Sequence, residues 1–167
     1  MNLRLGLRGA FAALALAAAH PAPNPIVGTW KLNTAKSTFT PGPGWRSQTR
    51  TYRATCLGGS FHPSQPNECG VSVSWTGVGA SGEAMHVAFI SRLDGKDYPM
   101  AGSANYDTLN ATPVDAFTVR SEEKRDGKVV GIAVRKVSAD GKVLTITDEG
   151  TNRKGEKFSQ VLVFERE

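Results

Sequence analysis

Two pairs of neighbouring acidic residues have the composition of a catalytic carboxylate pair. They are Glu122-Glu123 and Asp148-Glu149, and glycosidases use two carboxyl groups that flank the scissile bond. Adjacent side chains on a β-strand, however, point to opposite faces of the sheet. We therefore expect each pair to form a solvated strand edge and not a glycosidase site.

Other candidate motifs for catalysis or metal binding lack the context that their chemistry requires. Ser81, His86 and Asp94 are the residue types of a hydrolytic triad, but no motif exposes a strained serine. Residues 77–82 match G-x-G-x-x-G, but no βαβ unit surrounds them, so we expect a strand connection. The sequence has no H-E-x-x-H motif and no closely spaced cysteine pair. We predict no catalytic residue, no metal site, no cofactor and no enzymatic activity.

The chain contains two cysteines, Cys56 and Cys69. The segment between them, residues 57–68, is rich in the glycine and proline typical of loops. Two cysteines in an exported protein normally pair. We predict a structural disulfide, and closing this loop should stabilise the fold by roughly 2–3 kcal/mol.

The N-terminus is typical of a secretory signal peptide. Arg4 and Arg8 form a basic region, residues 11–19 are apolar, and residues 17–19 offer a small-residue cleavage site. The apolar run is too short to span a bilayer. We therefore predict an exported protein, periplasmic or secreted, without a membrane span.

These signals divide the chain into three parts: a signal peptide at 1–19, a flexible linker at 20–25 and one domain at 26–167. Cleavage removes two arginines and no acid, so the net charge of +5 falls to +3. The remaining basic residues form no cluster with interleaved aromatics, which argues against nucleic-acid binding. We expect a monomer.

The domain sequence is a succession of short strands. Val71, Val73 and Trp75 alternate with polar residues, which is the clearest period of two in the chain. Three Asp-Gly pairs between apolar runs are typical of hairpin turns, at residues 94–95, 126–127 and 140–141. We expect strands at 26–32, 45–55, 71–76, 85–90, 98–102, 106–113, 116–124, 128–138, 143–148 and 158–166.

This pattern predicts an all-β fold of about eight to ten antiparallel strands. Such a sheet must protect its edges, and closure into an up-and-down β-barrel does so most completely. A two-layer sandwich would have the same pattern and remains an alternative.

The first strand resembles the opening of lipocalins, with Gly28-Thr29-Trp30-Lys31-Leu32-Asn33 followed by Lys36-Ser37. Together with the segment from Asp94 to Pro99, it resembles a group of small exported bacterial proteins that are lipocalin-like and of uncharacterised function. The resemblance favours the barrel over the sandwich. It implies that Trp30 closes one end, with Gly28 beneath the indole and a late arginine, Arg166, over it.

A barrel of this size leaves room for one small ligand if its inward positions are not all filled by large side chains. Strand parity suggests seven apolar lining residues and two arginines that could meet a carboxylate: Trp75, Met85, Phe89, Phe117, Ile132, Phe158 and Leu162, with Arg120 and Arg135. We expect the interior to bind a small apolar or amphipathic molecule. The alternative is a cell-envelope or surface interaction module with a filled core and no cavity above about 100 Å³.

Overall fold

The computed structural model describes residues 24–56 and 69–167. The expected signal peptide at 1–19, most of the linker and the loop at 57–68 lie outside the described residues. The described chain forms eleven strands and one short 3₁₀ helix, η1 (Thr34–Lys36). The strands are β1 (Gly28–Leu32), β2 (Thr38–Thr40), β3 (Ser47–Cys56), β4 (Cys69–Val78), β5 (Ala84–Ser91), β6 (Tyr98–Ala101), β7 (Thr108–Pro113), β8 (Thr118–Arg125), β9 (Lys128–Val137), β10 (Val143–Thr151) and β11 (Lys157–Arg166).

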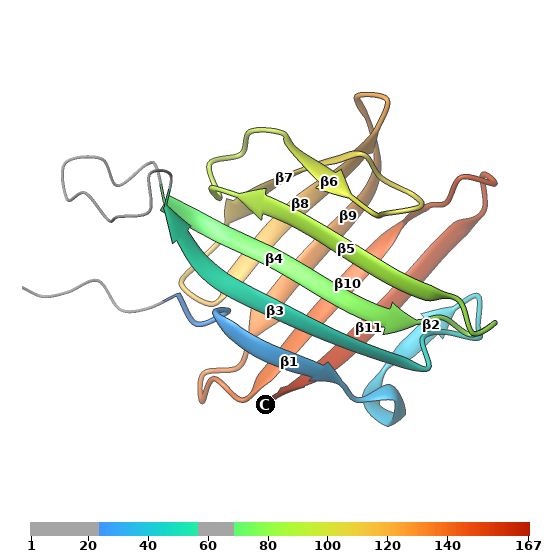
Figure 1. The fold of residues 1–167 in the computed structure, drawn as a ribbon, viewed down its shortest axis with the longest axis horizontal. Helices are drawn as coiled ribbons and strands as arrows, with labels where there is room; N and C mark the ends of the chain where they lie inside the picture. The colour runs from blue at the N-terminus through green and yellow to red at the C-terminus, as the bar shows by residue number, and fades with distance from the viewer. Residues whose placement is uncertain (1–23, 57–68) are drawn as a thin grey trace, which may run out of the picture.

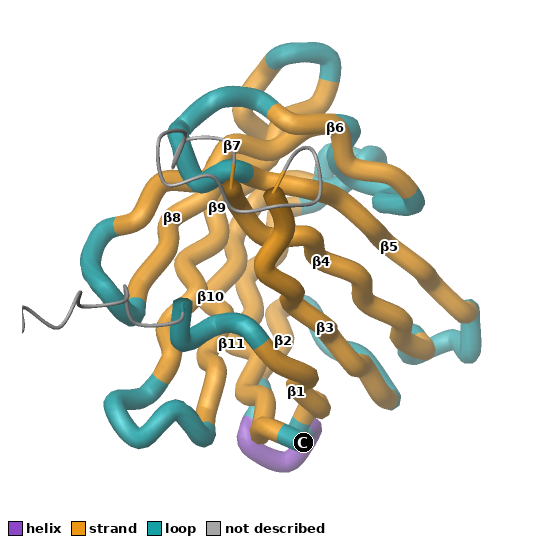
Figure 2. The backbone as a smooth tube through the Cα atoms, turned by 60° about the vertical axis from the view of Figure 1, so that its left-hand side comes forward, coloured by secondary structure: helices purple, strands orange, loops and turns teal. Residues whose placement is uncertain are grey.

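The strands form a closed antiparallel barrel (Figures 1 and 2). Each strand from β3 to β11 pairs with the next one along the chain, and β1 joins β3 to β11. β11 pairs with β1 along Phe164–Arg166 and with β2 along Ser159–Val161, so the first and last parts of the domain close the ring together. The predicted all-β, up-and-down barrel is confirmed, and the sandwich is excluded because the sheet is continuous.

The predicted strand positions agree with the structure, apart from the short β2, which the sequence analysis missed. The Asp126-Gly127 pair has positive φ angles of 52° and 73°. A two-residue turn of this kind matches the twist of the strands it joins. It connects β8 directly to β9, with Arg125 opposite Lys128.

The pairing of β8 with β9 contains one irregularity, which decides which residues of β9 face the interior. Lys124 lies opposite Val129, but Glu123 lies opposite Gly131. Val130 is therefore an extra residue, as in a β-bulge. Beyond it, Gly131, Ala133 and Arg135 are buried inside the barrel, while the residues between them face outward.

Trp30 is fully buried near the start of the barrel, where its indole Nε1 donates a hydrogen bond of 2.8 Å to the carbonyl of Ile26. The guanidinium carbon of Arg166 lies 4.1 Å from the centroid of the Trp30 ring. Arg166 also donates to the carbonyls of Pro25 and Val27 across the chain ends. This is the Trp–Arg arrangement that the lipocalin resemblance implies, and the missing Cβ of Gly28 leaves room for the guanidinium.

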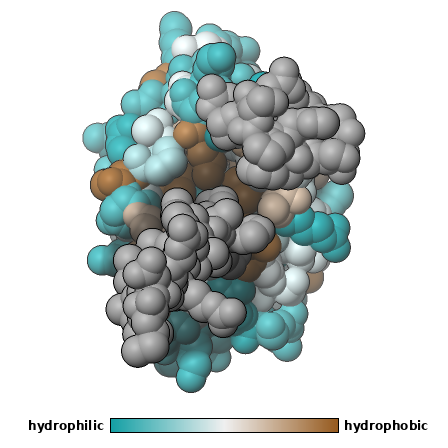
Figure 3. All heavy atoms as spheres, turned by 90° about the vertical axis from the view of Figure 1, so that its left-hand side faces the viewer, coloured by the Kyte–Doolittle hydropathy of each residue, from teal (hydrophilic) through white to brown (hydrophobic). Residues whose placement is uncertain are grey.

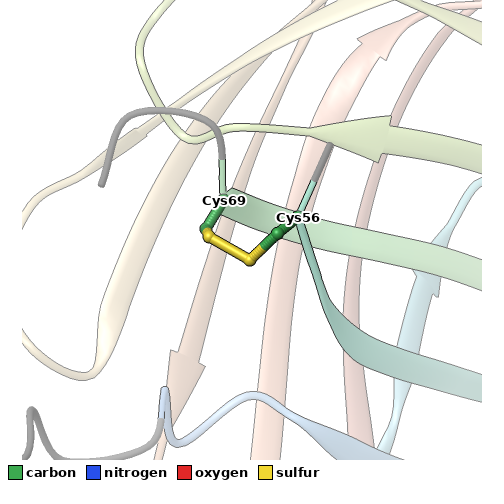
Figure 4. Close-up of a disulfide and its surroundings, with 2 residues drawn as sticks. All are labelled: Cys56 and Cys69. Carbon is green, nitrogen blue, oxygen red and sulfur yellow. A yellow bond between two sulfur atoms is a disulfide. The ribbon is translucent and has the colours of Figure 1, made fainter. Parts of the chain in front are cut away.

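A disulfide joins the end of β3 to the start of β4 (Figure 4). Cys56 and Cys69 are also cross-strand partners in the sheet. The predicted disulfide is therefore confirmed. Figure 3 views this end of the barrel and shows apolar surface between the segments drawn in grey.

Candidate functional site

The barrel contains a cavity of about 560 Å³ that opens at the end opposite Trp30. Residues at its mouth come from the β4–β5 turn (Ala80, Ser81) and the β10–β11 turn (Asn152, Lys154). Its volume lies within the range of about 300–1,000 Å³ that is typical of small-molecule sites. The filled-core alternative, which expects no cavity above about 100 Å³, does not match this interior.

Apolar and aromatic side chains form about half of the cavity wall, and the rest is polar. Trp75 on β4 packs edge-on against Trp45, with ring centroids 5.5 Å apart and planes at 86°. Further apolar side chains come from β2, β5, β6 and β11, namely Phe39, Met85, Phe89, Met100 and Phe158. These walls can cover the hydrocarbon part of a ligand.

The inner part of the cavity contains two carboxylates, Glu123 from β8 and Asp148 from β10. These strands are not neighbours, because β9 lies between them. The inward residues of β9 at this level are Gly131 and Ala133, whose small size lets the two acidic side chains approach above the strand. A Cβ on Gly131 would lie only 3.1 Å from Glu123 Oε2.

Two arginines lie in the same region, Arg135 from β9 and Arg50 from β3. Arg135 donates a hydrogen bond of 2.6 Å from Nη1 to Ser121, and its Nη2 lies 3.7 Å from Glu123 Oε1. The Nε of Arg50 donates to Gln48 at 2.8 Å. We refer to Arg50, Glu123, Arg135 and Asp148 as the charged cluster.

Arg50 is held in place by aromatic rings instead of by an acid. Its guanidinium carbon lies 5.1 Å from the ring centroid of Trp75 and 5.3 Å from that of Phe164. Both distances suit a cation–π interaction. No carboxylate of the described residues lies within ion-pair distance of Arg50, so its charge is available to a molecule in the cavity.

Several buried polar atoms of this region have no hydrogen-bond partner in the described part of the chain. They are Gln48 Nε2, Tyr52 Oη, Tyr106 Oη, Glu123 Oε2, Arg135 Nε and Asp148 Oδ1. Leaving such a group unpaired costs about 1–3 kcal/mol, and native proteins rarely tolerate it. Four of these residues, Tyr106, Glu123, Arg135 and Asp148, line the cavity, so both donors and acceptors face its inner end. Glu123 also lies close to Tyr106 and Asp148, and Tyr52 lines a separate small void.

The surroundings of the acids favour their protonated forms. Burial, followed by the negative charge of Asp148, raises the pKa of Glu123 to about 7, although Arg135 opposes the shift. Burial also raises the pKa of Asp148. Burial and the field of Glu123 raise the pKa of Tyr106, so the phenol stays neutral. Near neutral pH the charged cluster can therefore hold a proton that an exposed carboxylate would lose.

Solved structures with a similar fold include a phycobiliprotein lyase. The structure of the S-type phycobiliprotein lyase CPES from Guillardia theta aligns with a TM-score of 0.48 and 12% sequence identity, over 86% of this chain and 89% of that chain. No family model matches the chain, and no curated protein matches it. The interpretation of the cavity therefore depends on its own residues.

Five of the nine predicted ligand-binding residues line the cavity: Trp75, Met85, Phe89, Arg135 and Phe158. Leu162 points inward but is fully buried in the core, away from the cavity. The structure thus brings together residues from β4, β5, β9 and β11; strand parity indicates this for β4, β5 and β11.

Three predicted positions lie outside the cavity and correct the sequence analysis. Phe117 precedes β8 and is 41% exposed. Arg120 faces outward, where its Nη1 lies 3.1 Å from Glu122. Ile132 also faces outward, because the extra residue Val130 shifts the parity of β9 by one.

The acidic part of the site was missed. Glu122-Glu123 and Asp148-Glu149 do alternate between faces, but one acid of each pair points into the barrel and is not a solvated edge. The buried faces of β3 and β8 contain Gln48, Arg50, Ser121 and Glu123, so hydrophobic periodicity gives no sign of them. The one available signal is the alternation of a strand: when two neighbouring residues are both acidic, their side chains lie on opposite faces of the sheet, so one of them lies on the inner face.

The described residues contain neither a cluster of metal-ligating side chains nor a membrane-spanning helix. No group of three or more histidine, cysteine, aspartate or glutamate side chains there is arranged to hold a metal ion. No helix in the described ranges is long and apolar enough to cross a membrane.

Proposed function

We propose that this protein is an exported, non-catalytic binding protein that holds a small amphipathic molecule inside its barrel. The observation that carries the proposal is the cavity of about 560 Å³, which combines aromatic side chains with buried polar atoms that lack partners within residues 24–56 and 69–167. Such a combination suits a ligand with a hydrocarbon part and a polar head. The disulfide between Cys56 and Cys69 is compatible with an oxidising compartment.

The proposal is tested by heating the purified protein with and without bacterial lipid extract. A ligand that binds only the folded state raises the melting temperature, by mass action. Native mass spectrometry of the same mixture should then show a one-to-one adduct. Absence of both the shift and the adduct would contradict the proposal.

A matched pair of substitutions locates the binding. Met85→Trp would place a large side chain into the cavity from β5, whereas Ile90→Trp would add the same group on the outer face, where Ile90 is 50% exposed. We expect Met85→Trp to abolish the lipid-dependent shift and Ile90→Trp to retain it. Equal shifts in both variants would place the ligand elsewhere.

A further inference from the structure

The charged cluster contains features that the binding proposal alone does not explain. It combines two buried guanidinium groups with two acids. An apolar molecule would need only hydrocarbon side chains around it and none of these charged groups. The cluster also extends across the barrel, from Arg50 on β3 to Glu123, Arg135 and Asp148 on β8, β9 and β10. Its net charge therefore determines which polar head can be buried there.

The charge balance depends on one proton. If both acids are ionised, they neutralise Arg50 and Arg135. If the acid pair holds one proton, the cluster has a net charge of +1, and a monoanion restores neutrality. A cation would instead require both acids to be ionised and would still leave the cluster positive. Burial of an uncompensated charge is expensive, so neutrality should govern the choice of ligand.

The geometry of the two arginines also favours an anion. Arg50 lies between Trp75 and Phe164 without a carboxylate partner among the described residues, and it lines the cavity. The Nε of Arg135 is buried and unpaired in the described part of the chain. Guanidinium groups with free donors are well suited to carboxylate and phosphate groups.

We propose that the barrel binds an amphipathic molecule with a monoanionic head and that the acid pair Glu123–Asp148 takes up a proton as this head binds. The inference rests on the proposed function and specifies its ligand class. The head accepts hydrogen bonds from Arg50 and Arg135, the tail contacts the aromatic wall, and the proton on the acid pair removes the carboxylate charge that would repel the head.

The groups around the acid pair act in both directions. Burial of both acids, and the charge of Asp148 on Glu123, favour the proton. Arg50 on β3, Arg135 on β9, the nearby hydroxyl of Tyr106 and a hydrogen bond from Gln160 favour the ionised acids, but burial is the largest cause and the pKa of each acid is raised. Tyr106 stays neutral near neutral pH, since burial raises its pKa. Because the pKa of Glu123 is about 7 without ligand, a nearby anion must raise it further.

The sign of the pH dependence distinguishes the possible head groups. Binding that takes up a proton weakens as pH rises, and binding that releases one strengthens. We would measure the binding of dodecanoate, dodecanol and dodecylammonium to the full-length protein by calorimetry at about pH 6 and pH 8, on either side of the pKa of Glu123. These three probes share one tail and differ in the charge of the head.

We expect dodecanoate to bind best and to lose about tenfold in affinity between the two pH values, which is the change in the protonated fraction of a group with a pKa near 7. Calorimetry in two buffers of different ionisation heat should show uptake of about half a proton at neutral pH. Dodecanol should bind more weakly and with little pH dependence.

Glu123→Gln supplies a permanently uncharged side chain of the same shape. In this variant the affinity for dodecanoate should depend little on pH and should remain at pH 8 near the value that the parent has at pH 6. Glu122→Gln is the matched control, since Glu122 is the neighbouring residue on β8 and pairs outward with Arg120. It should retain the tenfold change of the parent. Arg50→Gln should remove the preference for dodecanoate over dodecanol.

The outcomes separate this inference from the proposed function. Tighter binding of dodecylammonium, or dodecanoate binding without proton uptake, would overturn the inference while leaving a ligand in the barrel. An unchanged pH dependence in Glu123→Gln would do the same. Failure of all three probes, together with no response to lipid extract, would overturn both.

Discussion

At the scale of single residues, the interior carboxyl groups set how this protein should respond to pH. The pKa of Glu123 is raised by burial and by Asp148, whereas the pKa of the neighbouring Glu122 is lowered by hydrogen bonds from Arg120 and Asn110. The pKa values of two adjacent residues on one strand are therefore shifted in opposite directions. The cause is the alternation of a strand, which puts one of them in a buried cluster and the other at the surface.

The stability of the ligand-free protein should fall as pH rises from about 5 to about 7.5. The folded state holds the Glu123 proton up to a pKa of about 7, whereas the unfolded chain loses it near the ordinary value of 4.5. The folded state thus binds more protons in this window, so deprotonation favours unfolding. Melting temperatures measured between about pH 5 and pH 7.5 test this prediction. The Glu123→Gln variant should show a smaller decrease in melting temperature over the same range.

Glu122→Gln is again the control. Because the pKa of Glu122 is lowered, its contribution to stability is present above its ordinary range and is lost in acid. The Glu122→Gln variant should therefore lose stability above about pH 5 to the same extent as the parent protein. A flat profile in the parent would show that the acid pair does not hold a proton in the folded state.

At the scale of the elements, the bulge in β9 creates the site. Regular pairing beyond the Asp126-Gly127 turn would place Val130 opposite Glu123 and Ile132 opposite Ser121, with both side chains inside. The extra residue instead puts Gly131 and Ala133 inside. Two small residues replace two large ones, which leaves space for the acids from β8 and β10. Bulges often re-aim side chains beside functional sites in this way.

Substitution on the two faces of β9 tests this arrangement. Gly131→Leu should lower the free energy of unfolding by about 1–3 kcal/mol, since it overpacks the space beside Glu123 and Tyr106. Ile132→Leu on the outer face should change it by about 0.5 kcal/mol or less. Denaturant unfolding measures both. The reverse order would mean that Ile132 and not Gly131 faces the interior.

At the scale of the whole molecule, the barrel has a closed end and an open end. Trp30 and Arg166 close one end, where β1 meets β11, and the charged cluster lies between this apolar region and the cavity mouth. A second, apolar void of about 20 Å³ lies behind Arg135. The cavity is therefore closed on the side of Trp30, and its charged residues lie at this inner end, away from the mouth.

Trp30→Ala should destabilise the whole fold by about 3–5 kcal/mol, the usual cost of deleting a buried aromatic side chain. The substitution also removes the indole hydrogen bond to Ile26 and the surface on which Arg166 rests. Thermal or denaturant unfolding checks the value. Trp45→Ala, at the partly exposed mouth, should cost less. A Trp30→Ala protein that melts within about a degree of the parent would show that the indole does not hold the barrel closed, since a loss of even 1 kcal/mol moves the melting point by several degrees.

The sequence by itself determined the strand pattern, the hairpin turns, the cysteine pair and the tryptophan and arginine of the closed end. The turns and strands are local or follow from a period of two, as in Asp126-Gly127 and in Val71, Val73 and Trp75. The pairing of Trp30 with Arg166 is instead what the lipocalin resemblance implies. The sequence also placed Trp75, Met85, Phe89 and Phe158 correctly, because the apolar face of each strand here is the inner one.

Only the tertiary structure decided the inner face of β9 and the meeting of Glu123 with Asp148. A bulge is one extra residue whose presence depends on pairing with the neighbouring strand, so Ile132 could not be placed by counting along β9 alone. The charged side chains follow no hydrophobic pattern, because Arg50, Glu123 and Asp148 lie on strands that come together only when the barrel closes. Their burial and the raised pKa values of the two acids are consequences of that closure and not of any single strand.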